Sequence, residues 1–200
     1  MNYRFVLSLL WLLSVLAPNS VKAEIKSYAQ SAQDSVEMSN HNLTPDKDGK
    51  IYYLRDDISF TITPEWEVLF NQQVAKNAYY FSMGTKDELS SGLITLVWLD
   101  YYMDLDVTLE SHKKHMIESE KYKWAEVKFS ETAYTTFLGR KCRECHYNVI
   151  SKEGAVNGKI IVFNSAIKTI TIFYQSGSSD KTINDLLFKD FKLSFGVRED

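Results

Sequence analysis

Several features that would assign a functional class are missing from this sequence of 200 residues. Two cysteines are too few for a disulfide scaffold. Basic residues number 23 against 26 acidic ones, so charge gives no reason to expect nucleic acid or anionic lipid as a partner. After residue 17, no apolar run is long enough to span a bilayer. The sequence also lacks G-x-S-x-G, a glycine-rich phosphate loop and H-E-x-x-H, so none of these enzyme classes is indicated.

The first 23 residues have the layout of a secretory signal peptide. Arg4 and the free amino group precede a mostly apolar run over residues 5–17, and Val21-Lys22-Ala23 places small residues where a signal peptidase reads them. A transmembrane anchor is the alternative, but it needs about 20 apolar residues, more than this run offers. We therefore expect cleavage after Ala23, a secreted or periplasmic mature protein, and no stable membrane anchor after cleavage.

Residues 24–50 are polar with little periodicity, which predicts a flexible lead. Beyond them, short runs show the period-two alternation of β-strands. The expected strands cover residues 51–54, 58–63, 66–70, 79–81, 93–99, 125–136, 140–151, 156–165, 168–175 and 191–195. Many strands with two separated helices predict a single α+β domain over residues 51–196, in which an antiparallel β-sheet is flanked by helices.

Two segments carry helical spacing instead. Between residues 104 and 121, one helix face collects four side chains: Leu105, Leu109, His112 and Met116. On this face we expect His112 at the margin of the core, with His115 in solvent. Near the C-terminus, Ser178-Ser179-Asp180 predicts a helix start. The apolar stripe of that helix is expected to consist of Ile183, Leu186 and Leu187.

Three short stretches, taken in order, carry a family resemblance. They are residues 58–66 (ISFTITPEW), residues 137–141 (FLGRK), and residues 184–186 (NDL) leading to residues 191–195 (FKLSF). In this order they resemble the PsbP-like family over about residues 51–195. The resemblance implies an α/β/α sandwich and a binding or assembly module. It implies no catalytic residues, because the family has no general catalytic set.

One motif, Cys142-Arg143-Glu144-Cys145-His146, matches the C-x-x-C-H signature of covalent haem attachment. The chemistry needs this spacing, because two thiols bind the two vinyl groups of one porphyrin and the next imidazole coordinates the iron. On a helical turn, residues i, i+3 and i+4 share one face and can act together. A related alternative is a metal site in which the two cysteines and His146 join His112 or His115.

A β-strand is the other interpretation of the same residues. In a strand, Cys145 and Tyr147 lie on one face, which is apolar, and Cys142, Glu144 and His146 lie on the other, which is polar. The two thiols then cannot bind one haem, and a disulfide between them would be badly strained. Because strong strand signals flank the motif, we favour the strand.

The sequence therefore predicts an exported, non-catalytic binding or accessory domain with no cofactor and no metal, whose partner is a protein or a small ligand. The alternative is a small exported c-type haem protein that uses Cys142, Cys145 and His146. An exported hydrolase without a recognisable motif is the third hypothesis.

Aromatic residues are the first candidates for a binding surface, and they are Trp98, Tyr101 and Tyr102. Three carboxylates cluster near them: Asp100, Asp104 and Asp106. These carboxylates could line a cleft or bind a cation, but acidic residues at a helix start explain them more simply.

Overall fold

The structure is a computed structural model that describes residues 43–55, 57–87, 90–119, 122–152, 154–165 and 167–198. The expected signal peptide, its cleavage after Ala23 and most of the polar lead lie outside the described residues. At the end of the lead, the carboxylate of Asp46 accepts hydrogen bonds from the backbone N–H groups of Asp48 and Lys50, each 2.9 Å long. These bonds form a tight turn that delivers the chain to the first strand.

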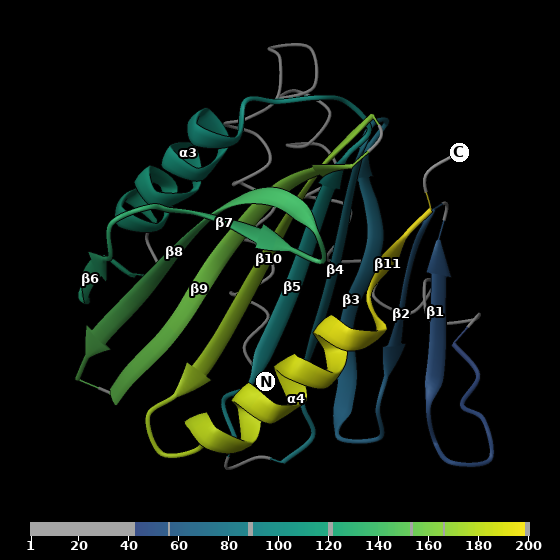
Figure 1. The fold of residues 1–200 in the computed structure, drawn as a ribbon. Helices are drawn as coiled ribbons and strands as arrows, with labels where there is room; N and C mark the ends of the chain where they lie inside the picture. Colours follow the sequence, from purple (N-terminus) through teal and green to yellow (C-terminus); the bar gives the residue numbers. More distant parts are fainter. Residues whose placement is uncertain are drawn as a thin grey trace.

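Nearly half of the described residues form one large antiparallel sheet (Figure 1). Its spatial order is β3-β4-β5-β10-β9-β8-β6, and β7 pairs with the first part of β8. The strands are β3 (Trp66–Ala75), β4 (Ala78–Thr85), β5 (Leu93–Leu99), β6 (Glu126–Phe129), β7 (Ala133–Phe137), β8 (Arg140–Ser151), β9 (Gly154–Ser165) and β10 (Lys168–Gly177). Strands that follow one another along the chain pair in most of the sheet, whereas the central pair β5–β10 joins segments far apart in sequence.

A second sheet has the order β1-β2-β11 and consists of β1 (Ile51–Arg55), β2 (Ile58–Ile62) and β11 (Gly196–Val197). Aromatic contacts join it to the large sheet. The ring of Phe60 lies 5.0 Å from that of Phe81 in β4 and 5.4 Å from that of Phe191 near the C-terminus. Because edge-on aromatic pairs of this kind add to the free energy of burial, the small sheet is part of the core.

The described helices are α3 (Leu105–Glu118) and α4 (Lys181–Ser194). They contribute to different hydrophobic clusters. Leu109 of α3 packs in one cluster with Val162, and Phe191 of α4 packs in the other with Ile161. Ile161 and Val162 are adjacent in β9 and point to opposite faces of the sheet. The two helices therefore cover opposite faces, which we call the α3 face and the α4 face.

The C-terminal helix differs from the sequence prediction. Residues 191–194, expected to lie in a closing strand, belong to α4, and the closing strand is the two-residue β11. The buried side of α4 consists of Asn184, Phe188 and Phe191, whereas Ile183 and Leu186 are exposed. The expected stripe was wrong for Ile183 and Leu186, because the aromatic α4 face accepts the phenylalanines, which share one helix face with Asn184. Leu187, the third residue of that stripe, packs partly against the same cluster.

The segment expected as one strand over residues 125–136 is two strands. β6 pairs with residues 147–150 of β8 and β7 with residues 140–144, and residues 130–132 cross from one pairing to the other. The hydroxyl of Ser130 accepts a hydrogen bond from the backbone N–H of His146 at 2.9 Å. This bond gives the backbone of β8 a hydrogen-bond partner between the part that pairs with β7 and the part that pairs with β6.

A buried polar network fixes the start of α4. The side chain of Asn184 donates to Ser176 Oγ at 3.1 Å and accepts from Ser90 Oγ at 3.1 Å, and Asn184 has no exposed surface. The carboxylate of Asp180 accepts from the backbone N–H of Ser91 at 2.6 Å. These bonds tie the chain before β5 to the helix. Breaking them would leave buried polar groups unpaired, which costs free energy.

At the level of fold class, the prediction of an α+β domain with an antiparallel sheet is confirmed. The sheet dominates, and each of its faces carries only one described helix, so the layers are less even than a sandwich implies (Figure 1). Both described helices fall short of the length and apolarity that a bilayer crossing requires.

Candidate functional site

The Cys142–His146 motif lies in the middle of β8, as the strand interpretation predicted. Cys142 belongs to the cluster on the α4 face and Cys145 to the cluster on the α3 face, so the sheet separates the two thiols. One expectation was wrong, because the face of Cys142 is also buried at this position. Phe137 and Phe163 pack in the same cluster, and together they cover it.

This geometry does not support the haem alternative. The thiols of Cys142 and Cys145 point into different clusters, and burial raises the pKa of each to about 11. His146 is exposed, and its ring lies 3.3 Å from the carboxylate of Glu144. Two thiols on opposite faces of a sheet cannot attach one porphyrin.

The sequence predicted His112 at the margin of the core and His115 in solvent, and the placement of His115 differs from that prediction. Both His112 and His115 are buried against the sheet. Nε2 of His112 lies 3.1 Å from Thr171 Oγ1, and its ring meets the ring of Phe173 edge-on at 5.0 Å. Within the described ranges, no three His, Cys, Asp or Glu side chains gather as a metal site.

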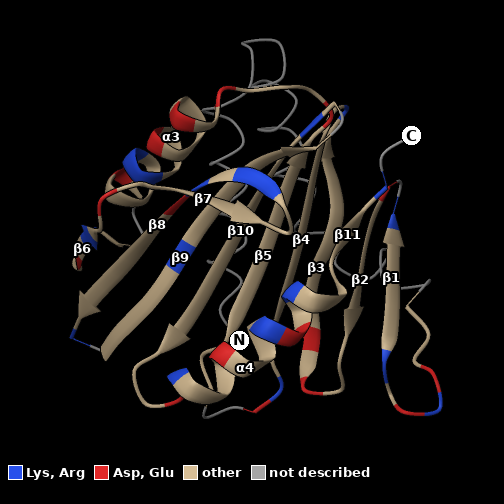
Figure 2. Ribbon diagram, in the orientation of Figure 1, with Lys and Arg blue, Asp and Glu red and all other residues tan. Residues whose placement is uncertain are grey.

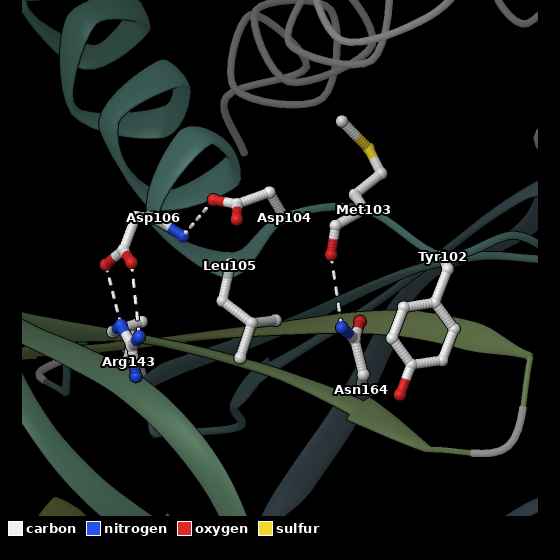
Figure 3. Close-up of a pocket in the computed structure, with 7 residues that line it drawn as sticks. All are labelled: Tyr102, Met103, Asp104, Leu105, Asp106, Arg143 and Asn164. Atoms are coloured by element: carbon white, nitrogen blue, oxygen red, sulfur yellow. Dashed lines mark hydrogen bonds and ion pairs between the residues drawn. The ribbon is translucent and has the colours of Figure 1, made fainter.

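An open pocket of about 360 Å³ lies where α3 begins (Figure 3). Residues 102–106 form one wall, and Arg143 of β8 and Asn164 of β9 form the other. It is on the α3 face, close to the carboxylates and aromatic residues that the sequence indicated. We take it as the candidate functional site.

Asp104 fixes the start of the helix beside this pocket. Its Oδ1 accepts hydrogen bonds from the backbone N–H groups of Asp106 at 3.0 Å and Val107 at 2.9 Å. This is the N-cap arrangement that acidic residues favour. The interpretation of Asp104 as a helix-start carboxylate is confirmed.

Asp106 faces the sheet and binds Arg143. Both carboxylate oxygens accept from the guanidinium group, at 2.6 and 3.1 Å. These hydrogen bonds hold the pKa of Asp106 below its usual value. The guanidinium carbon of Arg143 also lies 3.6 Å from the ring centre of Tyr134 in β7. Arg143 is therefore fixed between a carboxylate and an aromatic ring.

Asn164 holds the loop of residues 102–106 that forms the opposite wall. Its side-chain amide donates to the backbone carbonyl of Met103 at 3.1 Å, while its oxygen accepts from Thr169 Oγ1 at 2.8 Å. The hydroxyl of Thr169 also accepts from the backbone N–H of Met103, at 2.8 Å. The loop before α3 is thus bonded to both β9 and β10.

The three aromatic candidates have different positions. Tyr102 lines the pocket and is 65% exposed, so it fits the prediction. Trp98 is buried, stacked on the ring of Tyr79 at 4.5 Å, and Tyr101 is half-buried. Trp98 was a wrong candidate because it points toward the α4 face, where aromatic residues form the core.

The third carboxylate of the predicted cluster lies apart from the pocket. Asp100 accepts from the ammonium group of Lys168 at 2.5 Å, and Asp57 lies 3.4 Å from the same nitrogen. Because Asp57 precedes β2, this pair of contacts links the two sheets. Asp100 therefore has a structural partner.

Sequence reasoning missed Arg143, Tyr134 and Asn164. The signal for Arg143 was present, because period two puts residue 143 on the same face as Cys145, toward the acidic start of the helix. The sequence held no signal for Asn164, because its role is to hold the loop at Met103, which is distant in sequence.

Fold and pocket together define a sheet-dominated α+β domain with an open polar and aromatic recess. The fold is similar to that of cyanobacterial PsbP (CyanoP) from Synechocystis sp. PCC 6803, with a TM-score of 0.57 and 10% identity over 81% of this chain and 96% of that one. The Saccharomyces cerevisiae Ran-binding protein Mog1p aligns with a TM-score of 0.45 and 10% identity, over 78% of this chain and 96% of that one.

No protein-family model and no curated protein sequence matches this chain. The predicted resemblance to PsbP is confirmed for the fold (TM-score 0.57). At 10% identity, this likeness carries no information about the ligand.

Proposed function

We propose that the protein is an exported, non-catalytic binding or accessory domain, and that the pocket at the start of α3 contacts a partner protein. The observation that carries this proposal is that the polar side chains of the pocket are already hydrogen-bonded within the protein, while the ring of Tyr102 is exposed to solvent. Tyrosine, methionine and arginine are enriched in protein interfaces, and this pocket has Tyr102, Met103 and Arg143.

The ionisation of the nearby groups supports binding over catalysis. A general acid or base works best with a pKa near the working pH. The pKa of Asp106 is shifted away from neutrality by its hydrogen bonds with Arg143. Cys142 and Cys145, with pKa values raised to about 11, are protonated at neutral pH and so are poor nucleophiles.

The openness of the pocket favours a protein partner over a small ligand. Small-molecule sites enclose most of their ligand. Here one wall is a loop, Tyr102 extends into solvent, and the stacked pair of Tyr134 and Arg143 borders the recess on another side. Export rests on the signal-peptide pattern of residues 1–23.

A matched pair of tyrosines tests the proposal. Tyr102 in the pocket is 65% exposed, and Tyr52 on β1 is 67% exposed. Each is replaced in turn by a photo-crosslinking phenylalanine analogue in the full-length protein, expressed in its own host. We expect irradiation to give a discrete crosslinked protein from position 102 and none from position 52.

A second variant separates contact from folding. Tyr102→Ala should abolish co-purification of the crosslinked protein, while its unfolding midpoint in urea stays that of the wild type, because the side chain is largely in solvent. Equal crosslinking from both positions, or full co-purification with Tyr102→Ala, would contradict the proposed site.

A further inference from the structure

Strand β7 forms an open edge of the large sheet. Within the described residues it pairs with β8 alone, so its other side has no neighbouring strand there. Residues 133–136 are all exposed, and Tyr134 is 71% exposed. An edge of this kind presents backbone N–H and C=O groups to which a further extended chain can bond.

The turn that follows β7 determines which backbone groups point outward. Its two residues have φ values of 52° and 81°, the positive pair of a two-residue type I′ hairpin. In such a hairpin the residues that flank the turn, Phe137 and Arg140, form a hydrogen-bonded pair, and bonded pairs then alternate along the strands. Thr135 therefore bonds to β8, whereas Tyr134 and Thr136 direct their N–H and C=O groups away from it.

Other edges of the two sheets carry features that protect them from pairing. The register of β3 with β4 is interrupted twice, between residues 68 and 70 and between residues 73 and 75. β6 has the charged residues Glu126 and Lys128, and β11 has only two residues. Bulges, charges and short strands are common means of blocking an edge. By contrast, β7 has five uncharged residues in a regular register with β8 (Figure 2).

The edge of β1 is also regular, but it offers less to an added strand. The middle residue of β1, Tyr53, is 2% exposed, because its side chain points into the core. On β7, side chains are exposed on both faces of the sheet: Ala133 and Thr135 on the α4 face, Tyr134 and Thr136 on the α3 face. A strand added to β7 therefore gains side-chain contacts on both of its faces.

We infer that β7 pairs with β7 of a second copy of this chain, antiparallel and about a twofold axis at Thr135. The outward backbone groups favour this register, because Tyr134 then lies opposite Thr136 of the second copy and the two residues exchange both hydrogen bonds. The twofold axis repeats this pair on its other side. The large sheets of the two copies become one continuous sheet.

The side chains that meet across the axis suit a second copy as the occupant. Thr135 lies opposite itself, and Thr–Thr pairs are favourable between antiparallel strands. On the α3 face, Thr136 packs beside the ring of Tyr134, which Arg143 already holds with its guanidinium carbon 3.6 Å from the ring centre. No like charges meet, because β7 has no charged residue. A twofold interface requires a surface that is complementary to itself, and this edge has that property.

Paired cysteine variants test the position of the axis. Opposite residues of a pair that is not hydrogen-bonded have Cα atoms about 4.5 Å apart, within reach of a disulfide. Thr135 makes such a pair with its own copy, whereas the two Thr136 residues are offset along the strands and lie about 8 Å apart, beyond that reach. Thr135→Cys and Thr136→Cys are each made with Cys142→Ala and Cys145→Ala, so that no native thiol competes. With oxidised glutathione as the oxidant, we expect about tenfold more covalent dimer from Thr135→Cys than from Thr136→Cys.

A proline variant tests the backbone hydrogen bonds. Thr136→Pro removes an outward N–H and leaves the bonds to β8 in place, whereas Thr136→Val keeps that N–H. Because one strand pair buries little area, association is weak, and the purified full-length protein is followed by sedimentation equilibrium up to about 0.5 mM. We expect Thr136→Pro to raise the dimer dissociation constant by about tenfold or more and Thr136→Val by less than about twofold. Urea unfolding of each variant verifies that it is folded.

The inference is independent of the α3 pocket, since Tyr102→Ala should leave the dissociation constant unchanged. Sedimentation as a monomer over the whole concentration range would overturn it. Wild-type association of folded Thr136→Pro would do the same, because the outward N–H would then have no role. Equal yields of covalent dimer from the two cysteine variants would rule out an axis at Thr135.

Discussion

His112 makes the strongest prediction, because the fold keeps its ring neutral. The side chain is buried between α3 and β10, with Thr171 at one ring nitrogen and Phe173 against its face. Burial, with a smaller contribution from His115, lowers the pKa of His112 from 6.5 to about 3. Between these values the unfolded chain binds a proton that the folded chain does not, so stability falls as the pH falls.

The size of the effect follows from the shift. Each pH unit inside this window is worth about 1.4 kcal/mol. Acidifying from pH 7 to about 4.5 should therefore remove about 2.5 kcal/mol of unfolding free energy through His112 alone. Carboxylates with lowered pKa, such as Asp106, add their own losses, so the measurement has to be a difference between two proteins.

The assay compares urea unfolding of the wild type and His112→Gln at both pH values. The wild type should lose about 2.5 kcal/mol more than the variant, which has no titrating group at this position. The control is His146→Gln, because the side chain of His146 is 65% exposed and its replacement should leave the wild-type loss unchanged. Equal losses in the wild type and His112→Gln would refute the buried, neutral imidazole.

Three further predictions concern the core. Asn184→Leu should lower the unfolding free energy by about 2–3 kcal/mol in urea titrations, because the buried hydroxyl of Ser176 and the half-buried hydroxyl of Ser90 lose their hydrogen bonds to the amide. Gly158→Ala should lower it by about 1–3 kcal/mol, since a Cβ atom there would lie 2.2 Å from Cζ of Tyr147. Cys142 and Cys145 should react with a thiol reagent only in denaturant, and rapid labelling of the native protein would contradict their burial.

Strands and helices could be predicted from the sequence where the apolar residues followed a single period, either two or 3.6. Cys145, Tyr147 and Val149 alternate with polar residues, and β8 has the bounds expected from the sequence, residues 140–151. The end of α4 was harder because two periods overlap. Phe191, Leu193 and Phe195 alternate like a strand, while Asn184, Phe188 and Phe191 share a helix face. The aromatic α4 face decided in favour of the helix, and that contact joins distant residues.

The features of the candidate site that depend on residues close in sequence could be predicted. The cap at Asp104 and the exposed ring of Tyr102 are properties of one loop, and both were expected. The burial of His115 was not, because it depends on how the helix lies across the sheet. His112 and His115 are both covered, so the buried side of α3 is wider than the row of side chains that periodicity identified.

The Cys142–His146 segment shows why spacing alone does not define chemistry. On a helix, residues i, i+3 and i+4 converge, whereas on a strand the first and fourth residues diverge. The strand therefore removes the shared site that the motif needs. The same alternation gives Arg143 and Cys145 a common face, where Arg143 meets Asp106 and stacks on Tyr134. Arg143 is the residue of this segment that lines the pocket at the start of α3.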